Sequence, residues 1–89
     1  MTRHFADLRA PEIVSRLTST SIILQPVGAI EQHGPHLPLS VDLVVAAACA
    51  EAVAEARGDE LDIWLLPPLA VTKSNEHTGF PGSLSLKAM

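Results

Sequence analysis

The chain has 89 residues, a net charge of −4 with neutral histidines, and 47% hydrophobic against 18% charged residues. This composition predicts at most one globular domain and excludes disorder as the main state. The six Lys and Arg residues are scattered along the chain, so we expect no nucleic acid and no membrane as a partner. The longest apolar run is too short to span a bilayer.

The N-terminus and the cysteine content indicate a compartment. The opening segment MTRHFADLRAPEI contains no apolar stretch of the kind found in secretory leaders. The single cysteine, Cys49, has no second cysteine with which to form an internal disulfide. We therefore expect a cytoplasmic, reducing location. Because Cys49 lies among alanines in a helical pattern, we expect it to be a small core residue.

In chain order, residues 7–17 predict a short helix, because Pro11 suits a first helical turn and apolar residues recur on one face. Residues 21–25 predict a strand covered on both faces, since their centre is continuously apolar. Residues 28–40 are rich in glycine and proline and predict a loop.

The clearest predicted element is an alanine-rich helix that begins at Ser40 or Asp42 and runs to Arg57, with Gly58 as its stop. Its expected apolar face consists of residues at helical spacing, namely Leu43, Ala46, Ala47, Ala50, Val53 and Ala54. Two glutamates fall on the opposite side of this helix, which is typical of a helix with one face in water.

A second strand is expected over residues 63–66, where two prolines follow, and residues 72–83 predict a second polar loop. This order of elements predicts an α/β domain with a mainly parallel sheet and flanking helices, incomplete within residues 1–89. Both loops follow strands, and ligands bind beyond the carboxyl ends of parallel strands. We therefore expect the polar side chains of the two loops to converge.

Three side chains in and after the first loop have the chemistry of metal ligands. On extended backbone, Glu31 and His33 point to the same side, about 6–7 Å apart, and Asp42 follows at the mouth of the helix. Carboxylate and imidazole ligands suit zinc or manganese. The residue types leave an alternative open, in which Asp42 only caps the helix and Glu31 only holds a backbone N–H of the loop.

Four other polar residues are expected to have supporting roles. His36 follows a Gly-Pro pair, and loop packing or support of a ligand suits it better than direct metal binding. Ser74 lacks the sequence context of a nucleophile, so a hydrogen bond to substrate is its better role. Glu76 and His77 would point opposite ways on extended backbone, one towards the site and the other into the loop. Since phosphate-binding glycine motifs are missing, metal-assisted hydrolysis is the natural class.

Two segments resemble a known family. PVGAIEQHGPHLPLSVD, residues 26–42, and SNEHTGFPGSLSL, residues 74–86, are similar to motifs of the creatininase family, the creatinine amidohydrolase-like metal hydrolases. The resemblance covers nearly the whole chain from about residue 5. It implies that residues 1–89 are the N-terminal part of a single creatininase-like domain, and that further metal ligands of the family have no counterpart here.

The resemblance implies a site with two divalent metal ions, zinc or manganese. In that site Glu31 resembles the ligand of one ion, His33 the ligand of the other, and Asp42 the carboxylate that bridges both. Ser74 resembles a serine that borders the substrate pocket, and Glu76 and His77 would support catalysis. A metal-activated water would hydrolyse a C–N amide bond, as in the conversion of creatinine to creatine.

The resemblance further implies a small-molecule amide substrate and a homo-oligomer, a hexamer in many members. The alternative is a truncated, non-catalytic fragment of such a hydrolase, which acts only as a partial metal-binding or assembly piece. That alternative is motivated by the missing ligands, and for the same reason we expect the 89-residue chain alone to be inactive.

Overall fold

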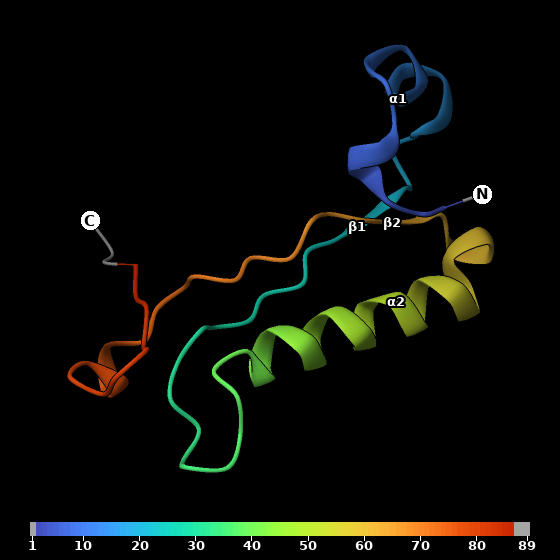
Figure 1. Cartoon of the computed structure of the whole chain (residues 1–89). Coiled ribbons are helices and arrows are strands. Elements are labelled where there is room, and N and C mark those ends of the chain that lie inside the picture. The colour runs from blue at the N-terminus through green and yellow to red at the C-terminus, as the bar shows by residue number, and fades with distance from the viewer. Residues whose placement is uncertain (1, 87–89) are drawn as a thin grey trace.

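The computed structural model describes residues 2–86 (Figure 1). Its elements are the 3₁₀ helix η1 (Phe5–Asp7), α1 (Ala10–Arg16), β1 (Ile22–Leu24), α2 (Val41–Leu61), β2 (Ile63–Leu65) and the 3₁₀ helix η2 (Asn75–His77). The strands are parallel, and α2 packs against β2. A parallel sheet with flanking helices is thus confirmed. None of the helices within residues 2–86 has the length and apolar character needed to cross a bilayer.

The segment that follows β1 and the segment that follows β2 continue side by side beyond the strands (Figure 1). Val27 and Leu69 form an isolated parallel bridge, and the Gly28 N–H donates to the Leu69 carbonyl at 2.9 Å. Further along, the Leu84 N–H donates to the Ile30 carbonyl at 2.8 Å. Because of this pairing, both polar loops lie beyond the carboxyl ends of β1 and β2. A parallel strand pair predicts that the two loops meet there.

Helix α2 is longer than the sequence indicates. It continues through Gly58 and ends at Leu61, and its C-cap residue Asp62 has a φ of 53°, so the prediction that Gly58 stops the helix is wrong. Gly58 is buried, and a Cβ at this position would lie 3.1 Å from Cγ of Arg3. The glycine therefore allows a close approach of the N-terminal segment rather than a change of chain direction.

The buried face of α2 is narrower than expected. Ala50 and Ala54, one turn apart, are 6% and 5% exposed and pack with Leu65 of β2. Val53 is 45% exposed, so its assignment to the apolar face is wrong. Cys49 is also exposed, which corrects the prediction of a core thiol. Both residues lie one position before a buried alanine, and a helix turns its side chains by about 100° per residue.

Strand β1 is less covered than its sequence indicates. Ile22 and Ile23 are each 44% exposed, whereas all three residues of β2 are buried. The prediction that residues 21–25 are covered on both faces is therefore wrong for this chain. The physical reason is that the helix packing within residues 2–86 falls on β2 and leaves β1 at the open side of the pair.

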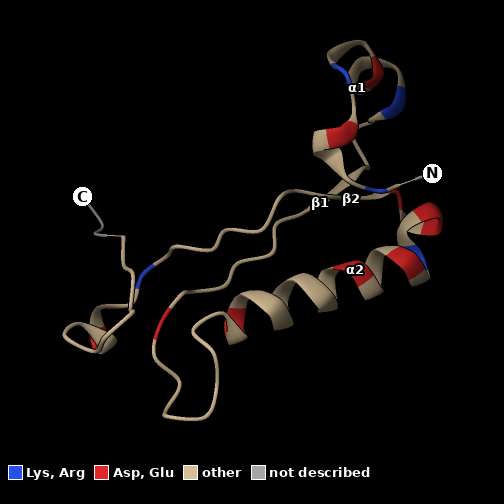
Figure 2. Ribbon diagram, viewed as in Figure 1, with Lys and Arg blue, Asp and Glu red and all other residues tan. Residues whose placement is uncertain are grey.

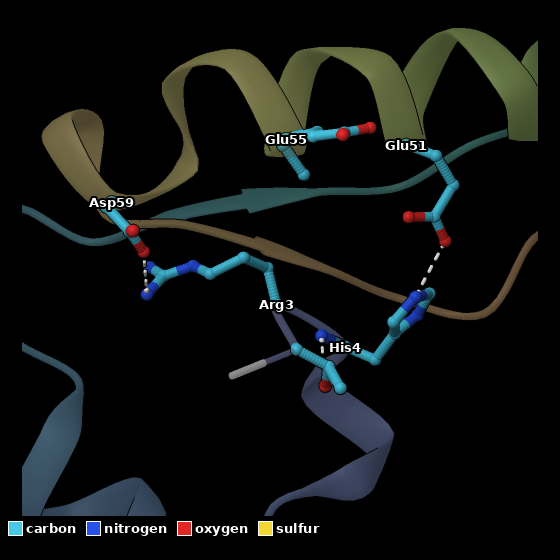
Figure 3. Close-up of a pocket in the computed structure, with 7 residues that line it drawn as sticks. Arg3, His4, Glu51, Glu55 and Asp59 are labelled. Atoms are coloured by element: carbon cyan, nitrogen blue, oxygen red, sulfur yellow. Dashed lines mark hydrogen bonds and ion pairs between the residues drawn. The ribbon is translucent and has the colours of Figure 1, made fainter.

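The N-terminal segment ties the end of α2 to β2 (Figure 3). The Arg3 guanidinium lies 4.0 Å from the ring centroid of Trp64, and it donates to the Asp62 carboxylate at 2.8 Å. Nearby, His4 Nε2 lies 2.6 Å from Oε1 of Glu51 in α2 (Figure 3). We call Arg3, Asp62 and Trp64 the Arg3 anchor, because a positive side chain of the chain itself neutralises the carboxylate there.

Candidate metal centre

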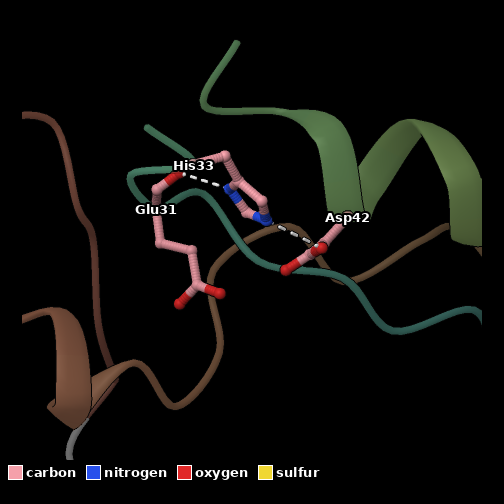
Figure 4. Close-up of side chains that lie close together, drawn as sticks. All are labelled: Glu31, His33 and Asp42. Carbon is pink, nitrogen blue, oxygen red and sulfur yellow. Dashed lines mark hydrogen bonds and ion pairs between the residues drawn. The ribbon is translucent and has the colours of Figure 1, made fainter. Parts of the chain in front are cut away.

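A close approach between the first loop and α2 places Asp42 at the site. A Cβ on Gly28 would lie 2.6 Å from Cα of Leu43, so glycine is required at this crossing. Ser40 occupies the N-cap position of α2 without a side-chain capping hydrogen bond. Asp42 lies inside the first turn, and its carboxylate faces His33 (Figure 4). The alternative in which Asp42 caps the helix is therefore wrong.

Glu31, His33 and Asp42 form what we call the first cluster (Figure 4). Each offers one ligand atom, and these atoms lie within 4.8 Å of one another. His33 Nδ1 donates to the Glu31 backbone carbonyl at 2.9 Å, and His33 Nε2 lies 3.1 Å from Asp42 Oδ1. The structure thus brings together the three side chains that the sequence singles out as candidate ligands.

The contacts of His33 show that its ring and the Asp42 carboxylate share either a proton or a metal ion. A backbone carbonyl only accepts hydrogen bonds, so Nδ1 carries a proton. Nε2 then faces an ionised carboxylate, which also only accepts. Their separation of 3.1 Å requires either a second ring proton or a metal ion. The Glu31 carbonyl and, to a lesser extent, the Asp42 carboxylate accordingly raise the pKa of His33.

Glu31 is a buried carboxylate with 9% of its surface exposed. Its Oε2 accepts a hydrogen bond from the hydroxyl of Ser74, which is fully buried. Its Oε1 lies 3.7 Å from Nε2 of His77, and within residues 2–86 it forms no ion pair with Lys or Arg. The Glu31 side chain therefore holds a hydroxyl rather than a backbone N–H. A buried negative charge of this kind is costly until a cation neutralises it.

The second loop forms the 3₁₀ helix η2 where extended backbone was expected. Lys73 Nζ donates to Glu76 Oε2 at 2.8 Å and lowers the pKa of Glu76, while His77 lies beside Glu31. The two side chains thus have different partners, although not through alternation on a strand, and their roles stay a prediction. Ligand atoms of Glu31, Glu76 and His77 also lie within 4.8 Å of one another, which defines a second cluster.

His36 and Ser74 differ in burial. His36 is exposed and belongs to neither cluster, and its ring lies 3.6 Å from the position of a Cβ on Gly34. This agrees with loop packing rather than ligation. Ser74 is held from both sides, because its N–H also donates to Ser85 Oγ at 3.0 Å. Its contact with a substrate stays a prediction.

Sequence reasoning missed Gln32. Its Nε2 donates to His77 Nδ1 at 2.9 Å, and its Oε1 accepts from the Gly34 N–H at 3.0 Å. The residue thus connects the two loops across 45 positions of sequence. A glutamine in a polar loop gives no periodic or spacing signal, so only its place between the candidate ligands Glu31 and His33 could have pointed to it.

The first cluster borders a pocket of about 440 Å³. It is lined by the carboxylates of Glu31 and Asp42, by apolar side chains of the loop and of α2, and by Lys73. Figure 2 shows acidic positions on the loop and on the first turn of α2, with a basic position on the neighbouring segment. Apolar walls with a few convergent polar groups are typical of small-molecule sites.

Residues 6–89 match the sequence model of the family described as creatininase, creatinine amidohydrolase. The chain belongs to the creatininase family. It is 49% identical over 67 residues to the mycofactocin precursor peptide peptidase of Mycolicibacterium smegmatis, a match that covers 73% of this chain and 27% of that protein. It is 37% identical over 70 residues to the creatinine amidohydrolase of Pseudomonas putida, covering 73% of this chain and 25% of that protein.

Solved creatininase structures share the fold. A manganese form superposes with a TM-score of 0.79 at 30% sequence identity, covering 98% of this chain and 35% of that chain. A mutant creatininase complexed with creatine gives 0.79 at 31% identity, covering 97% and 34%. A mutant of the Zn-Zn type gives 0.78. The chain spans about a quarter to a third of the length of these relatives.

Proposed function

We propose that this chain carries the N-terminal part of the metal centre of a creatininase-type amidohydrolase, with Glu31, His33 and Asp42 as metal ligands. The observation that carries the proposal is the 3.1 Å contact between His33 Nε2 and Asp42 Oδ1, which a ring proton or a metal ion between the two atoms would satisfy. The donor set supports it, because carboxylate and imidazole ligands suit zinc and manganese. Creatininase neighbours occur in both metal forms.

In the proposed site, the three side chains would have different roles as ligands of two divalent ions. Glu31 would hold one ion, His33 the other, and Asp42 would bridge them. When bound, such ions polarise an amide carbonyl and lower the pKa of water. The Ser74 hydroxyl orients the Glu31 carboxylate from the buried side, and the Glu31 carbonyl fixes the ring of His33 so that Nε2 faces Asp42.

The proposed reaction is hydrolysis of a C–N amide bond, in creatinine or in a related cyclic or linear amide. Higher identity to the mycofactocin precursor peptide peptidases than to the creatinine amidohydrolase favours a peptide amide. The pocket beside the first cluster suits a small amide or a peptide end. Calorimetric titrations of the chain with creatinine and with short peptide amides, each with and without metal, would distinguish these substrates by affinity and do not require turnover.

Metal binding tests the proposal directly. Isothermal titration of the purified chain with Zn²⁺ and Mn²⁺ is expected to show saturable binding, and a chelator should reverse it. Asp42→Asn keeps the shape of the side chain but removes the negative charge, and it should weaken binding strongly. Equal metal affinity of the wild-type chain and of this variant would contradict the proposed site.

A second candidate function is a partial metal-binding or assembly piece without turnover. It is favoured by the span of the chain relative to its relatives and by the exposed isoleucines of β1. We propose residues 1–89 as the N-terminal part of one creatininase-like domain, inactive alone. The purified chain should then bind metal without hydrolysing amides. Turnover by this chain that Glu31→Gln abolishes would refute the second candidate.

Assembly and location complete the proposal. We propose a homo-oligomer, a hexamer by family resemblance, because apolar side chains such as Val44, Val45 and Ile23 are exposed. Analytical ultracentrifugation measures this state, and a monomer at all concentrations would contradict it. We place the protein in the cytoplasm, where the exposed thiol of Cys49 stays reduced; fractionation with a fluorescent fusion tests this.

A further inference from the structure

Two histidines flank the Glu31 carboxylate, and their partners differ. His33 Nδ1 donates to a backbone carbonyl at 2.9 Å, which leaves Nε2 of the neutral ring with a free electron pair. His77 Nδ1 instead lies 2.9 Å from the side-chain nitrogen of Gln32. The same ring atom therefore faces an acceptor in one histidine and a donor in the other.

The orientation of the Gln32 amide follows from its second contact. The backbone N–H of Gly34 can only donate, and it lies 3.0 Å from Gln32 Oε1. The NH₂ group of Gln32 therefore faces His77, and because an amide NH₂ only donates, His77 Nδ1 accepts. In the neutral ring the proton of His77 is then on Nε2, the atom that lies 3.7 Å from Glu31 Oε1.

We propose that Gln32 holds His77 as an Nε2–H donor that positions the Glu31 carboxylate, and that His77 is not itself a metal ligand. The inference rests on the proposed function, in which Glu31 binds metal. At 3.7 Å the contact is an electrostatic attraction rather than a hydrogen bond. With the Ser74 hydroxyl at Oε2, each oxygen of the buried carboxylate then has a donor beside it.

The competing arrangement is a metal ion held by Glu31, Glu76 and His77, whose ligand atoms lie within 4.8 Å. Ligation through His77 Nε2 would move the ring proton to Nδ1, where it would meet the NH₂ of Gln32 donor against donor. Turning the amide over would relieve this clash but would take the acceptor from the Gly34 N–H. Glu76 is also exposed and already paired with a lysine. These contacts favour the donor role.

Ring ¹⁵N chemical shifts of the metal-free 89-residue chain, at a pH where His77 is neutral, test the tautomer. We expect the wild-type His77 as Nε2–H. In Gln32→Glu, a carboxylate still accepts from the Gly34 N–H but also accepts from the ring, so His77 should change to Nδ1–H. A wild-type His77 in the Nδ1–H form would overturn the proposal, whatever the variant does.

Zinc titrations separate positioning from ligation. His77→Gln retains an NH₂ donor near Glu31, so its zinc affinity should stay within about threefold of wild type, whereas His77→Ala should lose about 10–100-fold. Equal losses in both variants would identify His77 as a ligand and overturn the proposal. His33→Gln is the matched control, because an amide cannot replace the ring lone pair, and it should bind as weakly as His33→Ala.

Failure of the proposed function gives a different result. If the wild-type chain binds no zinc, the metal centre is contradicted, while the ring shifts of His77 still decide its tautomer. If the wild-type chain binds zinc and His77 is Nε2–H, but His77→Ala binds as tightly as wild type, the positioning role is contradicted and the metal centre is retained.

Discussion

The two ends of α2 each carry a cluster of charged side chains, and they differ in where the positive charge comes from. At the C-terminal end, Asp62 accepts from the Ser21 hydroxyl at 2.5 Å, from Arg3 at 2.8 Å and from the Trp64 indole at 2.9 Å. These donors, Ser21 first and Arg3 next, lower the pKa of Asp62. The Arg3 anchor is therefore complete within the chain.

At the N-terminal end of α2 the balance is different. Among the described residues, Glu31 and Asp42 form ion pairs only with histidines. The nearby Lys73 forms its ion pair with Glu76 instead. Both ends border a pocket, of about 370 Å³ at the anchor and about 440 Å³ at the first cluster. A pocket lined by charges is thus no sign of function by itself. The informative difference is a carboxylate pair that has no Lys or Arg partner within residues 2–86.

The largest expected effect comes from disrupting the Arg3 anchor, at the C-terminal end of α2, without changing the first cluster. Trp64 is 1% exposed, so Trp64→Ala should lower the free energy of unfolding by about 3–5 kcal/mol. Urea unfolding followed by circular dichroism measures this. Val14→Ala is the control, because Val14 is 85% exposed and its loss should change stability by less than about 0.5 kcal/mol. Similar losses in both variants would contradict the assigned core.

The second largest effect comes from changing the first cluster, at the N-terminal end of α2, without changing the Arg3 anchor. Glu31→Gln removes the buried charge while keeping the acceptor for Ser74, so zinc affinity should fall at least about 100-fold and stability should hold or rise. Calorimetric titration measures the affinity. Glu51→Gln is the matched control, since this glutamate is exposed, lies in the middle of α2 and pairs with His4 rather than with a residue of the first cluster. Loss of binding in the control would show that net charge, not the cluster, attracts the metal.

A substitution at the crossing of loop and helix should affect both properties. In Gly28→Ala the new methyl group meets the backbone of Leu43 at 2.6 Å, so the first turn of α2 must move and the variant should lose about 1–3 kcal/mol together with zinc affinity. Gly79→Ala is the control. Its φ of 96° makes alanine strained, but nothing lies within 4 Å, so it should lose stability while its zinc affinity stays unchanged.

The smallest expected effect is a pH dependence that is specific to the first cluster. Because the pKa of His33 is raised, metal must displace a proton there, and zinc affinity should fall about tenfold per pH unit below that pKa. The stability of the metal-free chain should depend on pH in the opposite direction. Without metal, the His33–Asp42 interaction stabilises the chain below the unfolded-state pKa, and this is lost as pH rises through the folded-state pKa.

Titrations between about pH 5 and 8 measure both effects. His33→Gln should remove the pH dependence of stability that comes from this pair. An unchanged pH profile in that variant would assign the effect to another group.

Local sequence signals predicted the parallel strands and the meeting of Glu31, His33 and Asp42, because strand order and loop position determine both. They failed for features that depend on contacts between residues far apart in the sequence. Gly58 is explained by the approach of Arg3 from the N-terminus. The exposure of β1 depends on what packs against it. The tautomer of His77 is set by Gln32, and no spacing within one loop encodes a hydrogen bond across 45 residues.

The central claim is that the first cluster accepts a cation through His33 Nε2. Ring ¹⁵N shifts of His33, recorded while Zn²⁺ is added to the purified chain, test it most directly. We predict a saturable change at Nε2 while Nδ1 keeps its proton, and no such change in Asp42→Asn. Zinc binding that leaves the His33 ring unaltered, or no saturable binding at all, would contradict the account.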